Sequence, residues 1–252
     1  RKNSKRLKNK NFKNFLGFPL FEWSLAAGLF LKQRLSGLRE ISVVCTSDDD
    51  QILDLVKKKY SSSILAVRRK PELSDDNAIL SDVIFDCIYK LAERHVISLD
   101  DYLSGSFILL QPTSPIRLKD DLVSFCRQIE NLGNNLSMVS VNKNYSEVKD
   151  IYEIIKFSTV KSDFLLGHIG KKLLKVRDTK KDKNLAFVDG SLYLGLMSML
   201  KEKGFMPAAK TLAFPLSIKR SIDIDTEEEF DDALVLIKEL QNLEIEYVSP
   251  KI

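Results

Sequence analysis

Residues 41–60 read ISVVCTSDDDQILDLVKKKY. The first six are mostly β-branched or apolar, which predicts a buried strand at 41–46. Ser47-Asp48-Asp49-Asp50 then supplies a polar loop and a helix start. The apolar residues at 52, 53, 55 and 56 predict an amphipathic helix that ends near Tyr60. A strand that leads directly into a helix is the building unit of an α/β protein.

The same alternation continues along the chain. Further strands are expected at 64–67, 107–110, 137–141 and 187–194, and further helices at 78–94, 118–131 and 226–240. Helices between strands indicate parallel pairing with right-handed crossovers. We therefore predict a doubly wound, mainly parallel α/β sheet, with ligands bound beyond the carboxyl ends of its strands.

The domain organisation follows from length and composition. The 252 residues are enough for one such domain, 1–252. The Lys- and Asp-rich segment 142–186 interrupts it and is either a mobile surface loop or an arm that packs on a second subunit. Because a doubly wound domain usually opens with a strand, we also expect a short apolar strand before Arg1.

Composition limits the classes of function. The 39 cations are offset by 35 anions, so the net charge of +4 does not favour nucleic acid as a partner. No apolar run approaches the roughly 20 residues that span a bilayer, so no membrane partner is expected. Cys45, Cys87 and Cys126 lack metal-ligand spacing and fit free thiols in a reducing cytoplasm. His95 and His168 have no partner at metal spacing.

An acidic run lies near the end of the chain, at Ser221-Ile222-Asp223-Ile224-Asp225-Thr226. On a strand, residues i and i+2 share a face, so Asp223 and Asp225 would project together. Mg²⁺ (or Mn²⁺) favours one or two carboxylates together with phosphate oxygens. The alternative, an edge strand with a solvated acidic face, is the commoner meaning of an isolated D-x-D. Thr226 and Glu229 then fit a capping box at the start of the last helix.

A basic loop opens the chain, with six Lys or Arg among the first ten residues. Its side chains and backbone N–H groups suit phosphate oxygens. The residues that offer side-chain donors are Asn3, Ser4, Lys5, Lys10 and Asn11. A solvated or nucleic-acid-binding tail is the alternative. The spacing of a Walker A loop is absent.

A third motif, Gln111-Pro112-Thr113-Ser114-Pro115, follows the strand at 107–110. Its prolines fix the backbone, so a rigid turn can present Gln111 and Ser114 as hydrogen-bonding groups at the rim of the sheet. A simple strand-to-helix connection is the alternative.

Taken together, these motifs resemble the acylneuraminate cytidylyltransferases (CMP-sialic acid synthetases) along most of the chain. The matching segments are Arg1 to Lys5 with Lys10-Asn11 (R-x-x-S-K…K-N), Gly17-Phe18-Pro19-Leu20 (G-x-P-L), Thr46-Ser47-Asp48, Arg69 to Leu73 with Asp76 (R-P-x-E-L…D), Leu110 to Arg117 (L-Q-P-T-S-P-L-R), Asp189 to Tyr193 (N-G-x-x-Y) and Asp223 to Glu227 (D-I-D-T-x).

The resemblance implies a Rossmann-like nucleotidyltransferase fold with a protruding dimerisation arm, and a homodimer. It also implies that CTP and a 2-keto sugar acid of the sialic type give a CMP-sugar and pyrophosphate. The implied triphosphate ligands are Arg1, Asn3, Ser4 and Lys10, with Lys5 and Asn11 in support. The implied cytosine and ribose neighbours are Arg68 or Arg69, and Asp76. The implied sugar-acid residues are Gln111, Ser114, Lys149, Asp189 and Tyr193. Asp223 and Asp225 would hold Mg²⁺, and with Arg1 and Lys10 they form the expected catalytic group.

Two departures from the family pattern concern the acceptor. Asp189 replaces the Asn of N-G-x-x-Y, and Phe187 replaces an Arg that often precedes it. A legionaminic, pseudaminic or Kdo-like acid is therefore an alternative acceptor. Two further alternatives are another sugar nucleotidyltransferase and a non-enzymatic module that binds anions or nucleic acid.

Overall fold

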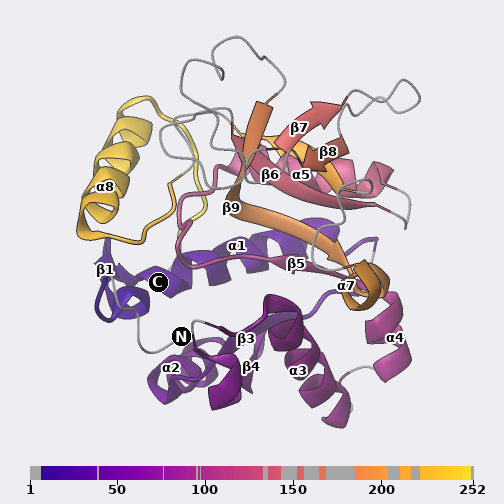
Figure 1. The fold of residues 1–252 in the computed structure, drawn as a ribbon. Coiled ribbons are helices and arrows are strands. Elements are labelled where there is room, and N and C mark those ends of the chain that lie inside the picture. The colour runs from indigo at the N-terminus through magenta and orange to yellow at the C-terminus, as the bar shows by residue number, and fades with distance from the viewer. Residues whose placement is uncertain are drawn as a thin grey trace.

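In the part of the chain that the structure describes, helices pack around a six-stranded sheet and a two-stranded sheet of β3 and β4, and a third, very short sheet is formed by β1 and β2 (Figure 1). The computed structural model describes residues 7–38, 40–75, 77–94, 96, 98–132, 136–142, 152–155, 165–168, 185–203, 211–216 and 222–250. The larger sheet has the strand order β5–β9–β6–β10–β8–β7, and β9 also pairs with β7. Its strands are β5 (Ser106–Leu109), β6 (Ser137–Asn142), β7 (Tyr152–Ile155), β8 (Leu165–His168), β9 (Leu185–Leu196) and β10 (Thr211–Pro215).

Parallel pairing joins β6 to β10, and it joins β3 (Val43–Ser47) to β4 (Ile64–Arg68) in the second sheet. In contrast, β9 runs antiparallel to β5, β6 and β7. A short antiparallel hairpin, β1 (Asn14–Phe15) and β2 (Phe18–Pro19), precedes the first helix. The antiparallel course of β9 is a feature that strand patterns alone did not predict.

Every helix expected from the sequence is present, with ends shifted by a few residues. The helices are α1 (Leu20–Leu35), α2 (Asp50–Tyr60), α3 (Leu80–Glu93), α4 (Leu99–Ser104), α5 (Lys119–Asn131), α7 (Met197–Lys203) and α8 (Glu227–Asn242), with short 3₁₀ turns η1 (Lys10–Phe12) and η2 (Pro71–Leu73). This alternation of strands and helices confirms the α/β class.

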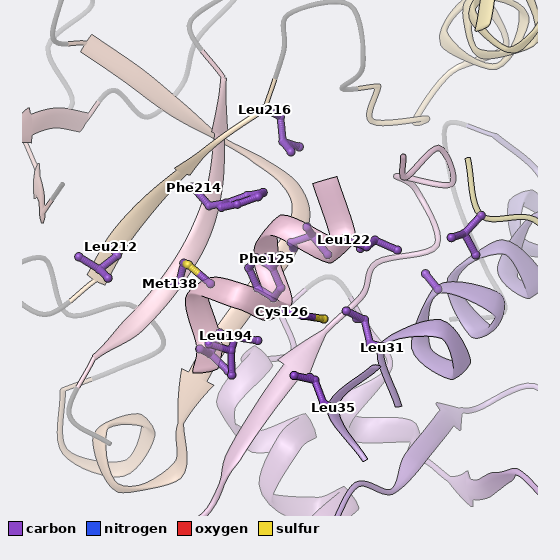
Figure 2. Packing of buried hydrophobic residues seen from close by; sticks show 14 residues of the cluster. Leu31, Leu35, Leu122, Phe125, Cys126, Met138, Leu194, Leu212, Phe214 and Leu216 are labelled. Carbon is purple, nitrogen blue, oxygen red and sulfur yellow. The ribbon is translucent and has the colours of Figure 1, made fainter. Parts of the chain in front are cut away.

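The helix α1 lies at the centre of the packing, because nine of its sixteen residues are buried. Its C-terminal half, with Leu31 and Leu35, belongs to the buried cluster that also contains Phe125 of α5 and Met138 of β6 (Figure 2). Its first turns belong to two other clusters, one with α8 and one with α2. A helix that is buried on several sides holds the two sheets and α8 in fixed relation, which positions the segments of the candidate site.

The capping box of α8 is present as predicted. Thr226 Oγ1 accepts a hydrogen bond from the N–H of Glu229 (3.2 Å), and Glu229 Oε2 accepts one from the N–H of Thr226 (2.8 Å). Figure 1 shows α8 beside β1 and the start of α1, and the rings of Phe230 and Phe15 pack edge to face there (5.5 Å between centroids). The cap therefore fixes the start of α8 next to the basic loop.

We expect Thr226→Ala to lower the free energy of unfolding by about 1 kcal/mol, because it removes the side-chain acceptor of the cap. In a chain of this size that corresponds to a drop in melting temperature of about 2–4 °C, measurable by thermal unfolding. Thr226→Ser keeps the acceptor and serves as the control. An equal drop in both variants would contradict this account of the cap.

The structure corrects the expected strand at the acidic run and describes only part of the segment 142–186. The acidic run is not a strand: residues 222–225 belong to no strand or helix. The alternation nevertheless holds, since Ile224 is fully buried and Asp223 is exposed. Within the segment 142–186, the structure describes residue 142, the hairpin of β7 and β8, and the start of β9. Most of the segment lies outside the described residues, so its role as an arm stays a prediction.

The three cysteines are free thiols, as expected. Cys126 is buried, whereas Cys45 and Cys87 are partly buried, and burial raises the pKa of each to about 11. Among the helices that the structure describes, none combines the length and apolar character that crossing a membrane requires.

Candidate active site

The basic loop and the acidic segment meet through Lys10. Its Nζ atom donates hydrogen bonds to Asp225 Oδ1 (2.7 Å) and to the carbonyl oxygen of Ile224 (3.0 Å). One turn further along the loop, Lys13 pairs with Glu227 and lies 4.3 Å from the centroid of the Phe230 ring. The two segments that the sequence analysis assigned to phosphate and metal therefore lie side by side.

Of the other predicted members of the basic loop, the structure describes Asn11. Asn11 lies in η1, next to Lys10, and is partly buried. Four expected phosphate ligands, Arg1, Asn3, Ser4 and Lys5, lie outside the described residues.

Three contacts hold the acidic segment in place. The buried side chain of Ile224 packs in the cluster that joins α1 and α8. Its N–H donates to the carbonyl oxygen of Thr113 (2.7 Å), in the turn after β5. Glu229 Oε2 accepts the N–H of Asp225 (2.7 Å). The turn at 111–115 is thereby attached to the aspartates, and Thr113 is a contact that the sequence analysis did not assign.

Asp223 lies in an electrostatic environment that opposes its charge. Its side chain keeps an exposed surface, but the surrounding protein removes part of its hydration, and this desolvation raises its pKa. The hydrogen bond from Thr113 and the charge of Lys10 lower the pKa, whereas the charges of Asp225 and Glu229 raise it. The net effect is a pKa above the ordinary value for aspartate, because its negative charge has too little compensation.

The aspartates suit a divalent cation that substrate phosphates help to hold. The ammonium group of Lys10 already occupies a position between a carboxylate and a backbone carbonyl oxygen, and hard cations favour these ligands. A cation would also offset the negative charge around Asp223. Among the described residues no group of three or more His, Cys, Asp or Glu side chains could hold a metal ion. A Mg²⁺ ion needs only one or two protein carboxylates, because it keeps waters and phosphate oxygens as its other ligands, so its assignment to Asp223 and Asp225 stays a prediction.

A second group of predicted residues surrounds Gly190 in β9. A Cβ atom at Gly190 would lie 3.2 Å from Gln111 Oε1, 3.5 Å from Ser114 Oγ and 3.8 Å from the Tyr193 hydroxyl. Gly190 has φ = 83°, a conformation that favours glycine. Ser114 Oγ is buried and has no hydrogen-bond partner among the described residues. The structure thus gathers Gln111, Ser114 and Tyr193 around one glycine and leaves a buried hydroxyl able to bond a ligand.

An irregularity in β9 produces this arrangement. From Val188 to Tyr193 the strand advances five residues, while the paired β6 advances two, from Val141 to Val139. At this irregularity, the side chain of Ser140 in β6 accepts a hydrogen bond from the N–H of Leu192 (2.8 Å). Bulges of this kind redirect side chains next to functional sites.

Asp189 lies inside the bulge and is 5% exposed. Its Oδ1 atom accepts hydrogen bonds from Ser140 Oγ and from the N–H of Ser191 (2.9 Å). Asp189 therefore stabilises the shape of β9, and its assignment to the sugar acid stays a prediction.

The structure gives different environments to Arg68 and Arg69, the two arginines that the sequence left as alternatives near the nucleotide base. Arg68 is exposed and pairs with Asp50. Arg69 is partly buried, and its Nη2 atom donates to the carbonyl oxygen of Thr46 (2.9 Å). Burial lowers the pKa of Arg69, and the charge of Asp48 counters that effect. Arg69 is the better candidate, because Asp48 and the end of β3 fix its position.

Two further residues assigned from the sequence, Asp76 and Lys149, lie outside the described residues. The sequence analysis gave no role to Arg117, which is buried in this region. Its position between the apolar residues Ile116 and Leu118 was a signal for a buried cation.

Residues 1–241 match the family model described as cytidylyltransferase. The chain belongs to the cytidylyltransferase family. It is therefore a nucleotidyltransferase, and its cationic and carboxylate-bearing segments meet at Lys10.

Curated relatives cover nearly all of this cytidylyltransferase. It is 29% identical over 229 residues to the CMP-N,N'-diacetyllegionaminic acid synthase of Legionella pneumophila, which covers 90% of this chain and 88% of that protein. It is 27% identical over 237 residues to the pseudaminic acid cytidylyltransferase of Campylobacter jejuni, with 93% and 92% covered. The N-acylneuraminate cytidylyltransferase of Streptococcus agalactiae is 25% identical, over 91% of this chain and 50% of that protein.

Solved structures support the Rossmann-like nucleotidyltransferase fold. A CMP:2-keto-3-deoxy-manno-octonic acid synthetase complexed with CTP superposes with a TM-score of 0.61 at 13% identity, over 94% of this chain and 95% of that one. An apo UDP-glucose pyrophosphorylase gives 0.58 at 12% identity, over 92% and 91%. At such identities the likeness concerns the fold alone.

Proposed function

We propose that the protein transfers CMP from CTP to the anomeric hydroxyl group of a 2-keto sugar acid of the sialic type and releases pyrophosphate. The observation that carries this proposal is that the turn at 111–115 contacts both the aspartate segment and the residues around Gly190. Thr113 holds the segment of Asp223 and Asp225, which lies against Lys10, while Gln111 and Ser114 of the same turn face Gly190. A triphosphate site and an acceptor site can thus lie next to each other.

The proposed reaction forms a bond between the anomeric oxygen and the α-phosphorus and breaks the bond from that phosphorus to the pyrophosphate oxygen. Positioning and charge compensation supply most of the acceleration in transfers of this kind. Lys10 would stabilise the charge that collects on the departing pyrophosphate, and Arg1 would assist it. Mg²⁺ (or Mn²⁺) held by Asp223 and Asp225 would neutralise phosphate charge and lower the pKa of the attacking hydroxyl.

The acceptor side rests on Gln111, Ser114 and Tyr193. Amide, hydroxyl and phenol groups around one point suit a polyhydroxylated ligand, and the unpaired Ser114 Oγ would gain a partner on binding. The relatives act, by their names, on pseudaminic, legionaminic and N-acylneuraminic acids. Legionaminic and pseudaminic acids are therefore the first acceptors to test within this class.

The test is pyrophosphate release from CTP and Mg²⁺ with a panel of N-acylneuraminic, legionaminic, pseudaminic and Kdo-type acids. We expect turnover with at least one nine-carbon acid and little with UTP, ATP or GTP. Turnover with a sugar 1-phosphate, and none with any acid, would contradict the proposed acceptor while preserving the enzyme class. A binding module without activity would instead show salt-dependent association with nucleic acid that is indifferent to Asp223→Ala.

We further propose that the enzyme acts as a cytoplasmic homodimer and that the segment 142–186 contributes to the subunit contact or covers the substrate. The polar composition of this segment supports the proposal, because so many Lys and Asp residues bury little surface within one subunit. Sedimentation of the protein, with and without residues 169–184, would show whether dimer formation depends on the segment.

A further inference from the structure

Arg117 is a buried cation that joins three segments next to the residues proposed to bind the acceptor sugar acid. It follows the turn after β5 and is 3% exposed. Its Nη1 atom donates to Ser24 Oγ of α1 (3.1 Å) and its Nη2 atom to the carbonyl oxygen of Gln111 (3.0 Å). Its Nε atom donates to the carbonyl oxygen of Ser191 in the bulge of β9 (3.0 Å). One guanidinium group thus fixes α1, the turn and the bulge together.

A buried guanidinium needs compensation for its lost hydration. Burial lowers the pKa of Arg117, and the negative charge of Asp189 raises it again; arginine stays protonated in proteins. A cavity beside Arg117, lined by Asp121 and Ser191 among others, has a volume of about 10 Å³, room for one water molecule at most. The three hydrogen-bond acceptors on Ser24, Gln111 and Ser191 therefore replace much of the hydration that the guanidinium group has lost.

The hydrogen bonds of Arg117 join the segments that carry the residues proposed to bind the acceptor sugar acid. The side chains of Gln111 and Ser114 come from the turn, and Gly190 and Tyr193 come from β9. The backbone links that run through Arg117 connect those two segments to each other. A shift of the bulge away from the turn by about 1 Å would disturb the acceptor more than the triphosphate, because the described contacts attach the aspartates to the turn and not to the bulge. Misplacements of this size can cost about 100-fold in rate.

We propose that Arg117, through its hydrogen bonds to Ser24, Gln111 and Ser191, is a positioning residue that sets the distance between the turn at 111–115 and the bulge of β9, and thereby the affinity for the acceptor sugar acid. This inference rests on the proposed function, because it assigns the group around Gly190 to the acceptor. It predicts that Arg117 acts on the acceptor sugar acid and much less on CTP.

The experiment compares Michaelis constants for the sugar acid and for CTP in the wild type, Arg117→Met and Arg117→Lys. We expect Arg117→Met to raise KM for the acid about 10-fold or more, and KM for CTP less than about 3-fold. Arg117→Lys keeps the charge but loses the fork of donors, so its effect should be intermediate. Arg127→Met, on the exposed face of α5, is the matched control and should change neither constant.

Arg117→Met removes a positive charge that acts on the buried Asp189 and leaves three buried acceptors without their donor, so it can fail to fold. The double variant Arg117→Met/Asp189→Asn removes both charges; we expect it to fold and to keep the raised KM for the acid. Ser24→Ala removes one hydrogen-bond acceptor of Arg117 and should raise KM for the sugar acid by about 3-fold.

Parallel rises in both Michaelis constants, or a lower melting temperature with an unchanged KM for the acid, would overturn the inference. A wild type that turns over no sugar acid would overturn the proposed function first, and this inference with it.

Discussion

Asp223→Ala is expected to slow CMP transfer about 100-fold or more without destabilising the fold. A bound metal contributes several kcal/mol of charge stabilisation to phosphoryl transfer, and the loss of about 3 kcal/mol corresponds to a factor of roughly 100. The measurement is kcat for pyrophosphate release across a range of Mg²⁺ concentrations. Wild-type kcat in Asp223→Ala would contradict the assignment of this carboxylate to the metal.

The stability of the same variant provides a second readout. Because the folded state raises the pKa of Asp223 above its unfolded value, the ionised carboxylate disfavours folding at neutral pH. Its removal relieves repulsion from Asp225 and Glu229 but loses the bond from Thr113. We expect a free energy of unfolding that is unchanged within about 0.5 kcal/mol or slightly higher. A variant that is inactive and fully stable is typical of a residue kept for function.

Asp225→Asn is the companion variant, with the opposite effect on stability. It should reduce kcat to a similar extent, since it weakens the second proposed metal ligand. It should also destabilise the protein, because Lys10 donates to Asp225 Oδ1 at 2.7 Å. The comparison separates the two aspartates: the same loss of activity is expected from both, with a loss of stability from Asp225 alone.

Lys10→Met is the second change with a large expected effect. The ammonium group of Lys10 is the described cation that lies against the aspartates, and removing one such preorganised charge costs about 100- to 1,000-fold in kcat. The side chains of Lys10 and Asp225 are 11% and 28% exposed, so their pair is worth more than a surface ion pair and less than a buried one. We expect a loss of about 1 kcal/mol in stability, measured by denaturant unfolding.

Lys13→Met is the matched control, from the same loop. Lys13 pairs with Glu227 and lies over the ring of Phe230, so its replacement should cost a similar amount of stability. It does not contact the aspartates in the described contacts, and kcat should stay within about 3-fold of the wild type. If Lys13→Met lost as much activity as Lys10→Met, the effect would come from the placement of the loop and not from the charge of Lys10.

The local parts of the fold were predictable from sequence because hydrophobic periodicity and capping are local. The strand at 41–46 and the helix after it correspond to β3 and α2, and the capping box of Thr226 and Glu229 is present at α8. The course of β9 was not predictable in the same way. Its antiparallel pairing and its bulge depend on partners far away in the sequence, Ser140 above all.

The candidate site shows the same division. The proximity of Lys10 and Asp225 agrees with the sequence analysis, where the family resemblance placed both in one catalytic group. The role of Asp189 within the bulge was not expected, because a carboxylate that bonds its own strand looks the same in sequence as one that binds a ligand. Arg117 was quoted as part of a motif and given no task. Its three acceptors lie in α1, the turn and β9, and only tertiary structure brings these together.

The pair of Lys10 and Asp225 spans 215 residues, and this separation has a consequence during protein synthesis. At about 5–20 residues per second, a ribosome needs roughly 10–40 s to pass from one to the other. During that interval the nascent polypeptide carries the basic loop without its acidic counterpart. CTP stabilises a chain only if it binds the folded form, so a product interrupted before the aspartates gains no protection from its own substrate and stays open to proteolysis.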